Sequence, residues 1–129
     1  MNEQRKGMLM ILHRLGVTCQ YKHLGTHDIY FCSFEDNTFS ISVNGQHVNM
    51  NKFLGYHSLD QQNAIFRLAK NVIQKGQDVM LIDNHGEKHI GLNVVYSSER
   101  DRKQLFYSIC YFLQIISCGT FLQTKAIAA

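Results

Sequence analysis

The strongest constraint on the fold is an uncharged stretch near the end of the chain. No Asp, Glu, Lys or Arg occurs from Gln104 to Thr124. Much of this stretch is apolar or aromatic nearly all the way round a helix, through Leu105, Phe106, Tyr107, Ile109, Cys110, Tyr111, Phe112, Leu113, Ile115 and Ile116. A helix with no polar face cannot leave a broad side in water. It must therefore be sandwiched inside the domain, shared with a partner chain or placed in a membrane.

A membrane location is the least favoured of these three options. The segment 105–122 approaches the length of a bilayer span, but polar residues interrupt it and no other segment resembles a span. At the N-terminus, Arg5 and Lys6 precede an apolar run of five residues, 8–12, which is too short for the core of a signal peptide. We therefore expect a cytoplasmic protein whose final helix is buried or lies at an interface.

Length and composition predict one folded domain. The chain has 129 residues, of which 45% are hydrophobic and 18% charged, as in globular rather than disordered proteins. A chain of this length buries roughly two-thirds of its unfolded surface, so it needs no disulfide or metal. We expect a single α+β domain over 1–129 with a less regular tail at 119–129. The net charge of +3 comes from dispersed Lys and Arg residues, so nucleic acid is not predicted as a partner.

The hydrophobic pattern predicts three helices and five to six strands. Helical spacing of apolar residues predicts helices at 3–15, 59–75 and 98–117. Alternating or continuous apolar runs predict strands at 17–24, 28–35, 39–43, 46–51, 79–82 and 90–94. Whether 46–51 forms a separate strand stays open. The order α-βββ(β)-α-ββ-α predicts a two-layer α+β fold, with one antiparallel sheet packed against the helices.

Short motifs mark the ends of several of these elements. The pair Asn44-Gly45 follows an alternating strand and predicts a type I′ hairpin, in which both central residues have positive φ. Ser58 is followed three residues later by Gln61, as in a capping box at the start of a helix. Ser98 with Asp101 predicts a similar cap for the final helix.

Four cysteines occur without a CxxC pair, and we expect them to be buried free thiols in a reducing compartment. Cys110 and Cys118 fall in the apolar helix, whereas Cys19 and Cys32 fall in predicted strands. A disulfide between Cys19 and Cys32 stays open, because it requires the two residues to face each other on paired strands.

No motif predicts catalysis, and we expect no cofactor and no metal. His23 and His27 are four residues apart, as are His85 and His89, and the second pair could in principle meet one ion together with Glu87. Neither pair lies on a predicted helix, no HExxH is present, and a zinc site needs three or four convergent ligands. No GxSxG or phosphate-binding loop occurs. A metal-dependent enzyme is therefore the least favoured function, and we expect a protein that is not an enzyme.

Surplus apolar surface is the better lead to function. The strand at 28–35 is apolar on both faces, with Ile29 and Phe31 on one and Tyr30 and Phe34 on the other. Helices can cover only one face, so the second shows an apolar strip unless a partner covers it. The final helix has a similar excess. The residues predicted to bind a partner are Tyr30, Phe34, Phe112 and Ile116.

The order helix, three strands, helix, two strands, helix resembles the type III secretion chaperone-like fold, and more loosely the bacterial sensory-type proteins that share it. The resemblance covers residues 4–116, with 58–75 as the middle helix and 98–117 as the last, and it is one of architecture rather than motif. It implies homodimers that bind extended segments of client proteins along apolar grooves. A longin- or profilin-like module is the alternative architecture.

Together these patterns favour a non-enzymatic, chaperone-like module that binds proteins or peptides and acts as a homodimer. An exposed sheet edge would offer a place to add a strand from a client. The alternative is a small-ligand sensor domain with a pocket between helix and sheet.

Overall fold

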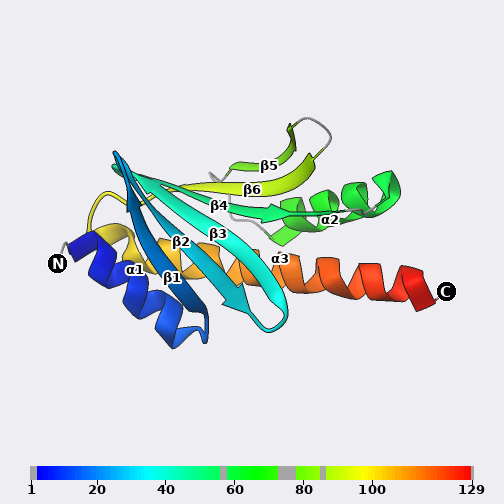
Figure 1. Cartoon of the computed structure of the whole chain (residues 1–129), viewed down its shortest axis with the longest axis horizontal. Coiled ribbons are helices and arrows are strands. Elements are labelled where there is room, and N and C mark those ends of the chain that lie inside the picture. The colour runs from blue at the N-terminus through cyan, green and yellow to red at the C-terminus, as the bar shows by residue number, and fades with distance from the viewer. Residues whose placement is uncertain (1–2, 56–57, 73–77, 85–86, 129) are drawn as a thin grey trace.

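The computed structural model describes residues 3–55, 58–72, 78–84 and 87–128. Its elements in chain order are α1 (Glu3–Arg14), β1 (Thr18–Leu24), β2 (His27–Phe34), β3 (Asn37–Asn44), β4 (His47–Phe53), α2 (Leu59–Val72), β5 (Asp78–Asn84), β6 (Glu87–Val95), the 3₁₀ turn η1 (Glu99–Asp101) and α3 (Arg102–Ala128). The order α-ββββ-α-ββ-α confirms the predicted α+β fold (Figure 1). Because β4 is a separate strand, the first run has four strands, one more than the order on which the resemblance rests.

All six strands belong to one antiparallel sheet in the order β1-β2-β3-β4-β6-β5. The first four strands form a meander because two-residue turns join each strand to the next. The pairs that flank these turns are Leu24 with His27, Phe34 with Asn37, and Asn44 with His47. After α2 the chain returns as the β5–β6 hairpin, and β6 pairs with β4. The two edges of the sheet are therefore β1 and β5.

The hairpin turn between β3 and β4 differs from the predicted one. Asn44 pairs with His47, so Asn44 ends the strand and the central turn residues are Gly45 and Gln46. Of these two, only Gly45 has a positive φ, 62°. Positive φ at the first central position alone is typical of a type II′ turn rather than type I′.

The core lies between the sheet and the helices, which cover one face of the sheet and leave the other open (Figure 1). Burial alternates along the strands, as in β3, where Phe39, Ile41 and Val43 are buried. From the helix side, Phe112 meets Phe39 edge-on, with ring centroids 5.6 Å apart. Each strand therefore has one face in the core and one face turned away from it.

Over residues 105–116, α3 is sandwiched inside the domain, the first of the three options that its uncharged sequence allowed. Its side chains at Leu105, Ile109, Phe112 and Ile115 are fully buried. It packs against the sheet and against α2. Among the described residues, no helix combines the length and apolar character that crossing a bilayer requires.

The tail differs from the prediction, because α3 continues to Ala128 rather than becoming irregular at 119. Gly119 does not end the helix, since one glycine in a helix costs only about 1 kcal/mol relative to alanine. The residues after it include no proline, so no lost backbone donor forces a stop. Residue 129 lies outside the described part of the chain.

The two predicted helix caps have different outcomes. At α2, Ser58 and Gln61 form the reciprocal capping box: the Gln61 N–H donates to Ser58 Oγ (3.2 Å) and the Ser58 N–H to Gln61 Oε1 (3.0 Å). Ahead of the final helix, Ser98 is the N-cap of η1 and makes no side-chain capping bond. The Asp101 carboxylate instead accepts hydrogen bonds from the N–H and the hydroxyl of Ser97, the residue before Ser98 (2.9 and 2.6 Å).

Candidate functional site

The structure places the predicted partner-binding residues mostly in the core. Tyr30, Phe112 and Ile116 are 1%, 0% and 3% exposed, and Phe34 is half-buried. The reason is that Tyr30 and Phe34 lie on the face of β2 that the helices cover, and α3 packs against that face. A partner cannot reach the three buried side chains in this structure, so the apolar surface open to a partner lies elsewhere.

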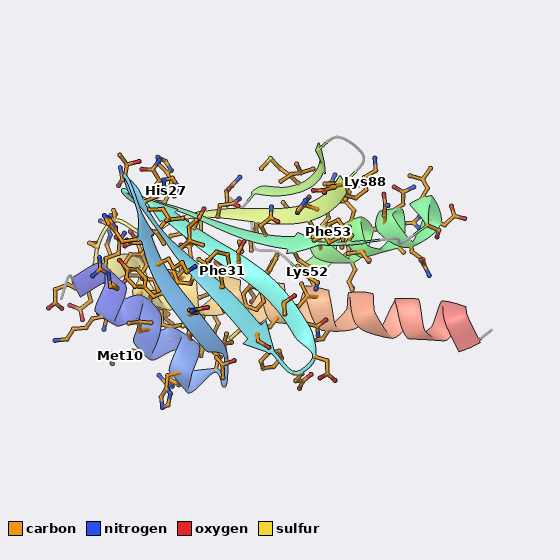
Figure 2. The ribbon with its side chains drawn as sticks, viewed as in Figure 1. Met10, His27, Phe31, Lys52, Phe53 and Lys88 are labelled. Carbon is orange, nitrogen blue, oxygen red and sulfur yellow. The ribbon has the colours of Figure 1, made fainter. Side chains whose placement is uncertain are left out.

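That surface is the open face of the sheet, on the side away from the helices. Phe31 on β2 and Phe53 on β4 point to this face, and they are 46% and 47% exposed. Two large aromatic side chains left half in water carry an apolar area that most surface positions avoid. Figure 2 labels both of them, Phe31 over the first strands and Phe53 near the end of β4. The sequence pattern had identified the face of Phe31 but not Phe53, because the predicted strand ended at residue 51.

A shallow hollow of about 590 Å³ lies between these two phenylalanines, and we call it the open-face hollow. Its lining residues are Thr18, Cys19, Gln20, Phe31, Cys32, Ser33, Thr38, Phe39, Ser40, Asn51, Phe53 and His89. Among the described residues that line it, none is Asp, Glu, Lys or Arg. The hollow therefore combines aromatic side chains with hydroxyl and amide groups and carries no fixed charge.

The strand register sets the polar floor of the hollow. Phe31 pairs with Ser40, and Ser40 pairs with Asn51 across β2, β3 and β4. On the other side of Phe31, Gln20 is its partner on β1. Directly paired residues point to the same face of a sheet. One row across four strands thus presents an amide, a phenyl ring, a hydroxyl and a second amide.

The sheet opens at one end of the hollow. The pairing of β3 with β4 ends at Ser40 with Asn51. On either side the ladders continue, to Phe34 with Asn37 between β2 and β3 and to Phe53 with His89 between β4 and β6. The start of β3 and the end of β4 therefore separate, and in Figure 1 the two strands diverge there. The hollow takes lining residues from both sides of this gap.

His89 lies at the β6 side of the hollow and has a defined set of neighbours. Its Nδ1 lies 2.7 Å from Asn51 Oδ1, and its ring centroid lies 5.3 Å from that of Phe53. Since an amide oxygen only accepts, Nδ1 carries the proton in this hydrogen bond. On the other side of the ring, Nε2 lies 3.8 Å from Glu87 Oε2. These contacts hold the imidazole in place at the edge of the hollow.

The histidine pairs considered for metal binding do not come together as sites. His85 lies outside the described residues, so its pairing with His89 has no structural counterpart here. His23 makes a hydrogen bond with Asp28, with Nδ1 2.7 Å from Oδ1, whereas His27 contacts Thr26. Within the described ranges, no group of three or more His, Cys, Asp or Glu side chains could hold one ion.

A polar network under the sheet edge connects α1 to the first hairpin. Asp28 accepts hydrogen bonds from the Tyr21 hydroxyl and from His23 Nδ1, both at 2.7 Å, and its other oxygen lies 3.7 Å from the Arg5 guanidinium. Burial alone would raise the pKa of Asp28, but these hydrogen bonds and Arg5 outweigh it and lower the pKa. Arg5 also stacks on the Tyr21 ring, 4.5 Å from its centroid. The sequence pattern had no signal for this network, which joins residues of three elements.

A second hollow, of about 550 Å³, lies between α1 and the start of α3. Met10, Arg14 and Phe106 line it, and the Arg14 guanidinium lies 5.5 Å from the Phe106 ring centroid. Across it Arg102 pairs with Glu99 at 3.3 Å. Its cations are thus partly engaged within the chain, and the open-face hollow remains the stronger candidate.

Comparisons with known proteins add no identity to this geometry: neither family models, nor curated proteins, nor solved structures include a significant match to the chain.

Proposed function

We propose that this protein is a non-enzymatic binding module that receives an extended segment of a client protein in the open-face hollow. The observation that carries the proposal is the pair Phe31 and Phe53, half exposed on either side of an uncharged polar floor that none of the described helices covers. Recognition sites combine apolar side chains with polar groups that fix the orientation of the ligand, and this hollow offers both, with a larger polar share than most. The architectural resemblance to secretion chaperones points to the same class of function.

The chemistry of the hollow selects a neutral, extended ligand. Side chains of an extended peptide alternate, so apolar residues on one side of the peptide, about four apart, can contact Phe31 and Phe53 while the peptide backbone faces the floor. Ser40, Asn51 and Gln20 supply donors and acceptors for backbone N–H and C=O groups. The gap between β3 and β4 gives such a segment a place to enter. The lining itself has no fixed charge, and the nearby Lys22 Nζ lies 5.8 Å from the Phe31 ring centroid, so we expect binding to depend only weakly on salt.

A homodimer stays a prediction, and the structure changes which surface would form it. Because the apolar side chains of α3 between Leu105 and Ile116 are mostly buried within their own chain, that part of the helix needs no partner to cover it. The open face remains, and we propose that two copies cover each other's open faces until a client segment displaces one of them. The small-ligand alternative has less support, since side chains such as Phe39 and Phe112 fill the space between sheet and helix.

The test is a peptide array that tiles soluble proteins of the native host, probed with the full chain. We expect a subset of peptides with alternating apolar residues to retain the protein. The double variant Phe31→Ser/Phe53→Ser should lose at least tenfold in affinity for them, because two half-buried contacts of about 1 kcal/mol each are removed.

The matched control is Met10→Ser, which removes an exposed apolar side chain (63%) from α1 rather than from the open face. It should bind like the unmodified protein. Equal loss in both variants, or retention of no peptide at all, would refute the open-face hollow as the client site. Circular dichroism of each variant establishes that it is folded.

A further inference from the structure

Two of the free cysteines face each other across the first hairpin. Cys19 on β1 is the direct register partner of Cys32 on β2. Directly paired residues point to the same face, and here both lie on the helix side, Cys32 buried and Cys19 half-buried. The condition that the sequence left open, two cysteines opposed on paired strands, is therefore met.

The hydrogen-bond pattern identifies the kind of pair they form. The next pair along the ladder is Thr18 with Ser33, and Thr18 Oγ1 donates to the Ser33 carbonyl oxygen at 3.3 Å. That carbonyl thus points toward β1, and successive residues of a strand point their backbone polar groups to opposite sides. The backbone N–H and C=O of Cys32 therefore point toward β3, so Cys19 and Cys32 form a non-hydrogen-bonded pair. Such pairs have Cα atoms about 4.5 Å apart, within the range of about 4.4–6.8 Å that a disulfide accepts.

The position of the pair determines how it can react. Burial raises the pKa of the Cys19 thiol and raises that of Cys32 to about 12, so the folded protein holds few thiolates at neutral pH. However, β1 is an edge strand with a sheet neighbour on one side only. Edge strands open locally more readily than central ones. Opening of β1 exposes Cys19 first, because it is the less buried of the two.

We propose that Cys19 and Cys32 form a reversible disulfide under oxidising conditions and that it locks the edge strand β1 onto β2. The oxidant is a small-molecule disulfide. The Cys19 thiolate attacks one sulfur of that disulfide and releases one thiol, and the Cys32 thiolate then attacks the Cys19 sulfur of the mixed disulfide and releases the second. Two protein thiols are oxidised, and one external disulfide is reduced to two thiols. The inference does not rest on the proposed client binding, although both cysteines are among the residues that line the open-face hollow.

Peptide mapping after incubation in glutathione buffers of increasing oxidised fraction tests the proposal. Trypsin places Cys19 in peptide 15–22 and Cys32 in peptide 23–52, whereas the other two cysteines share peptide 104–125. We expect the first two peptides to become linked before any other pair. A mixed disulfide that persists on Cys19, or linkage to peptide 104–125 instead, would overturn the proposal.

Stability provides the second readout. A closed loop restricts the unfolded chain, so the oxidised protein should have a higher urea midpoint than the reduced protein. The variant Cys19→Ala should show the same midpoint in both buffers, whereas Cys110→Ala should keep the shift. An oxidised protein with a midpoint equal to or below that of the reduced one would show that the bond strains the hairpin rather than locking it.

Discussion

Tyr30 and Phe31 are neighbours in sequence with opposite environments. The pleat of β2 turns Tyr30 to the helices, where it is 1% exposed, and Phe31 to the open face, where it is 46% exposed. Burial also raises the pKa of Tyr30. Alternation alone predicts that the two side chains point apart, but not which of them the helices cover. The choice between them decides which residues can meet a partner.

At the residue scale, Asp28 provides a test of stability against pH. Its folded-state pKa is lowered, so its contribution is present above the unfolded pKa of about 3.9 and is lost as pH falls through the folded value. We expect Asp28→Asn to lower the free energy of unfolding by about 1–2 kcal/mol at neutral pH, because it weakens charge-assisted hydrogen bonds. Urea unfolding at neutral pH and in steps down to about pH 3 measures this.

The matched control is Asp36→Asn, since Asp36 is exposed in a hairpin turn. It should change the free energy of unfolding by less than half a kcal/mol or so. The difference in free energy of unfolding between Asp28→Asn and the unmodified protein should become smaller as the pH falls. A gap that is constant over the whole range would argue against a role for the Asp28 charge.

At the element scale, helix ends could be predicted from short motifs only where the motif acts locally. The capping box of α2 involves residues three apart and forms as predicted. Before the final helix the predicted bond between Ser98 and Asp101 does not form, and Asp101 bonds to Ser97 instead. The reason is that η1 precedes α3 and moves the start of the helix. The strand ends were harder, since β4 extends to Phe53 by pairing with His89, a residue far along the chain.

The two serine caps predict different effects of the same substitution. Ser58→Ala removes a side-chain acceptor and disrupts a reciprocal pair, so it should destabilise the protein by about 1 kcal/mol. Ser98→Ala removes no capping bond and should cost clearly less. Thermal unfolding of the two variants under one condition compares them. The variant Ser58→Asp should keep most of the stability that Ser58→Ala loses. Equal effects of the two alanine variants would contradict the assigned caps.

At the scale of the whole molecule, the domain buries residues 105–116 of the helix that first suggested a partner. The sheet and α2 pack around α3, and the apolar residues left at the surface include a group on the opposite face of the sheet, such as Phe31, Phe53 and Met80. Enclosure of α3 is a property of the layers and not of the helix, because any one of three environments would have satisfied its sequence.

Self-association through the open face is testable by sedimentation velocity. We expect the unmodified chain to sediment as a dimer at micromolar concentration and Phe31→Ser/Phe53→Ser as a monomer, because the variant loses the central apolar contacts. Met10→Ser should remain dimeric. Addition of an array-selected peptide should shift the unmodified chain toward monomer. If the unmodified chain is a monomer at every concentration, the homodimer is refuted. Client binding would then still be decided by the peptide array.

The sequence by itself determined most of the elements, their order and the two-layer class, because periodicity, turns and caps act within a few residues. It also determined that β2 would be apolar on both faces. Only the tertiary structure decided which face the helices cover, where β3 and β4 separate, and that Cys19 lies opposite Cys32. Those facts depend on register and packing between segments far apart in the chain, and side-chain period and local propensity contain no information about either.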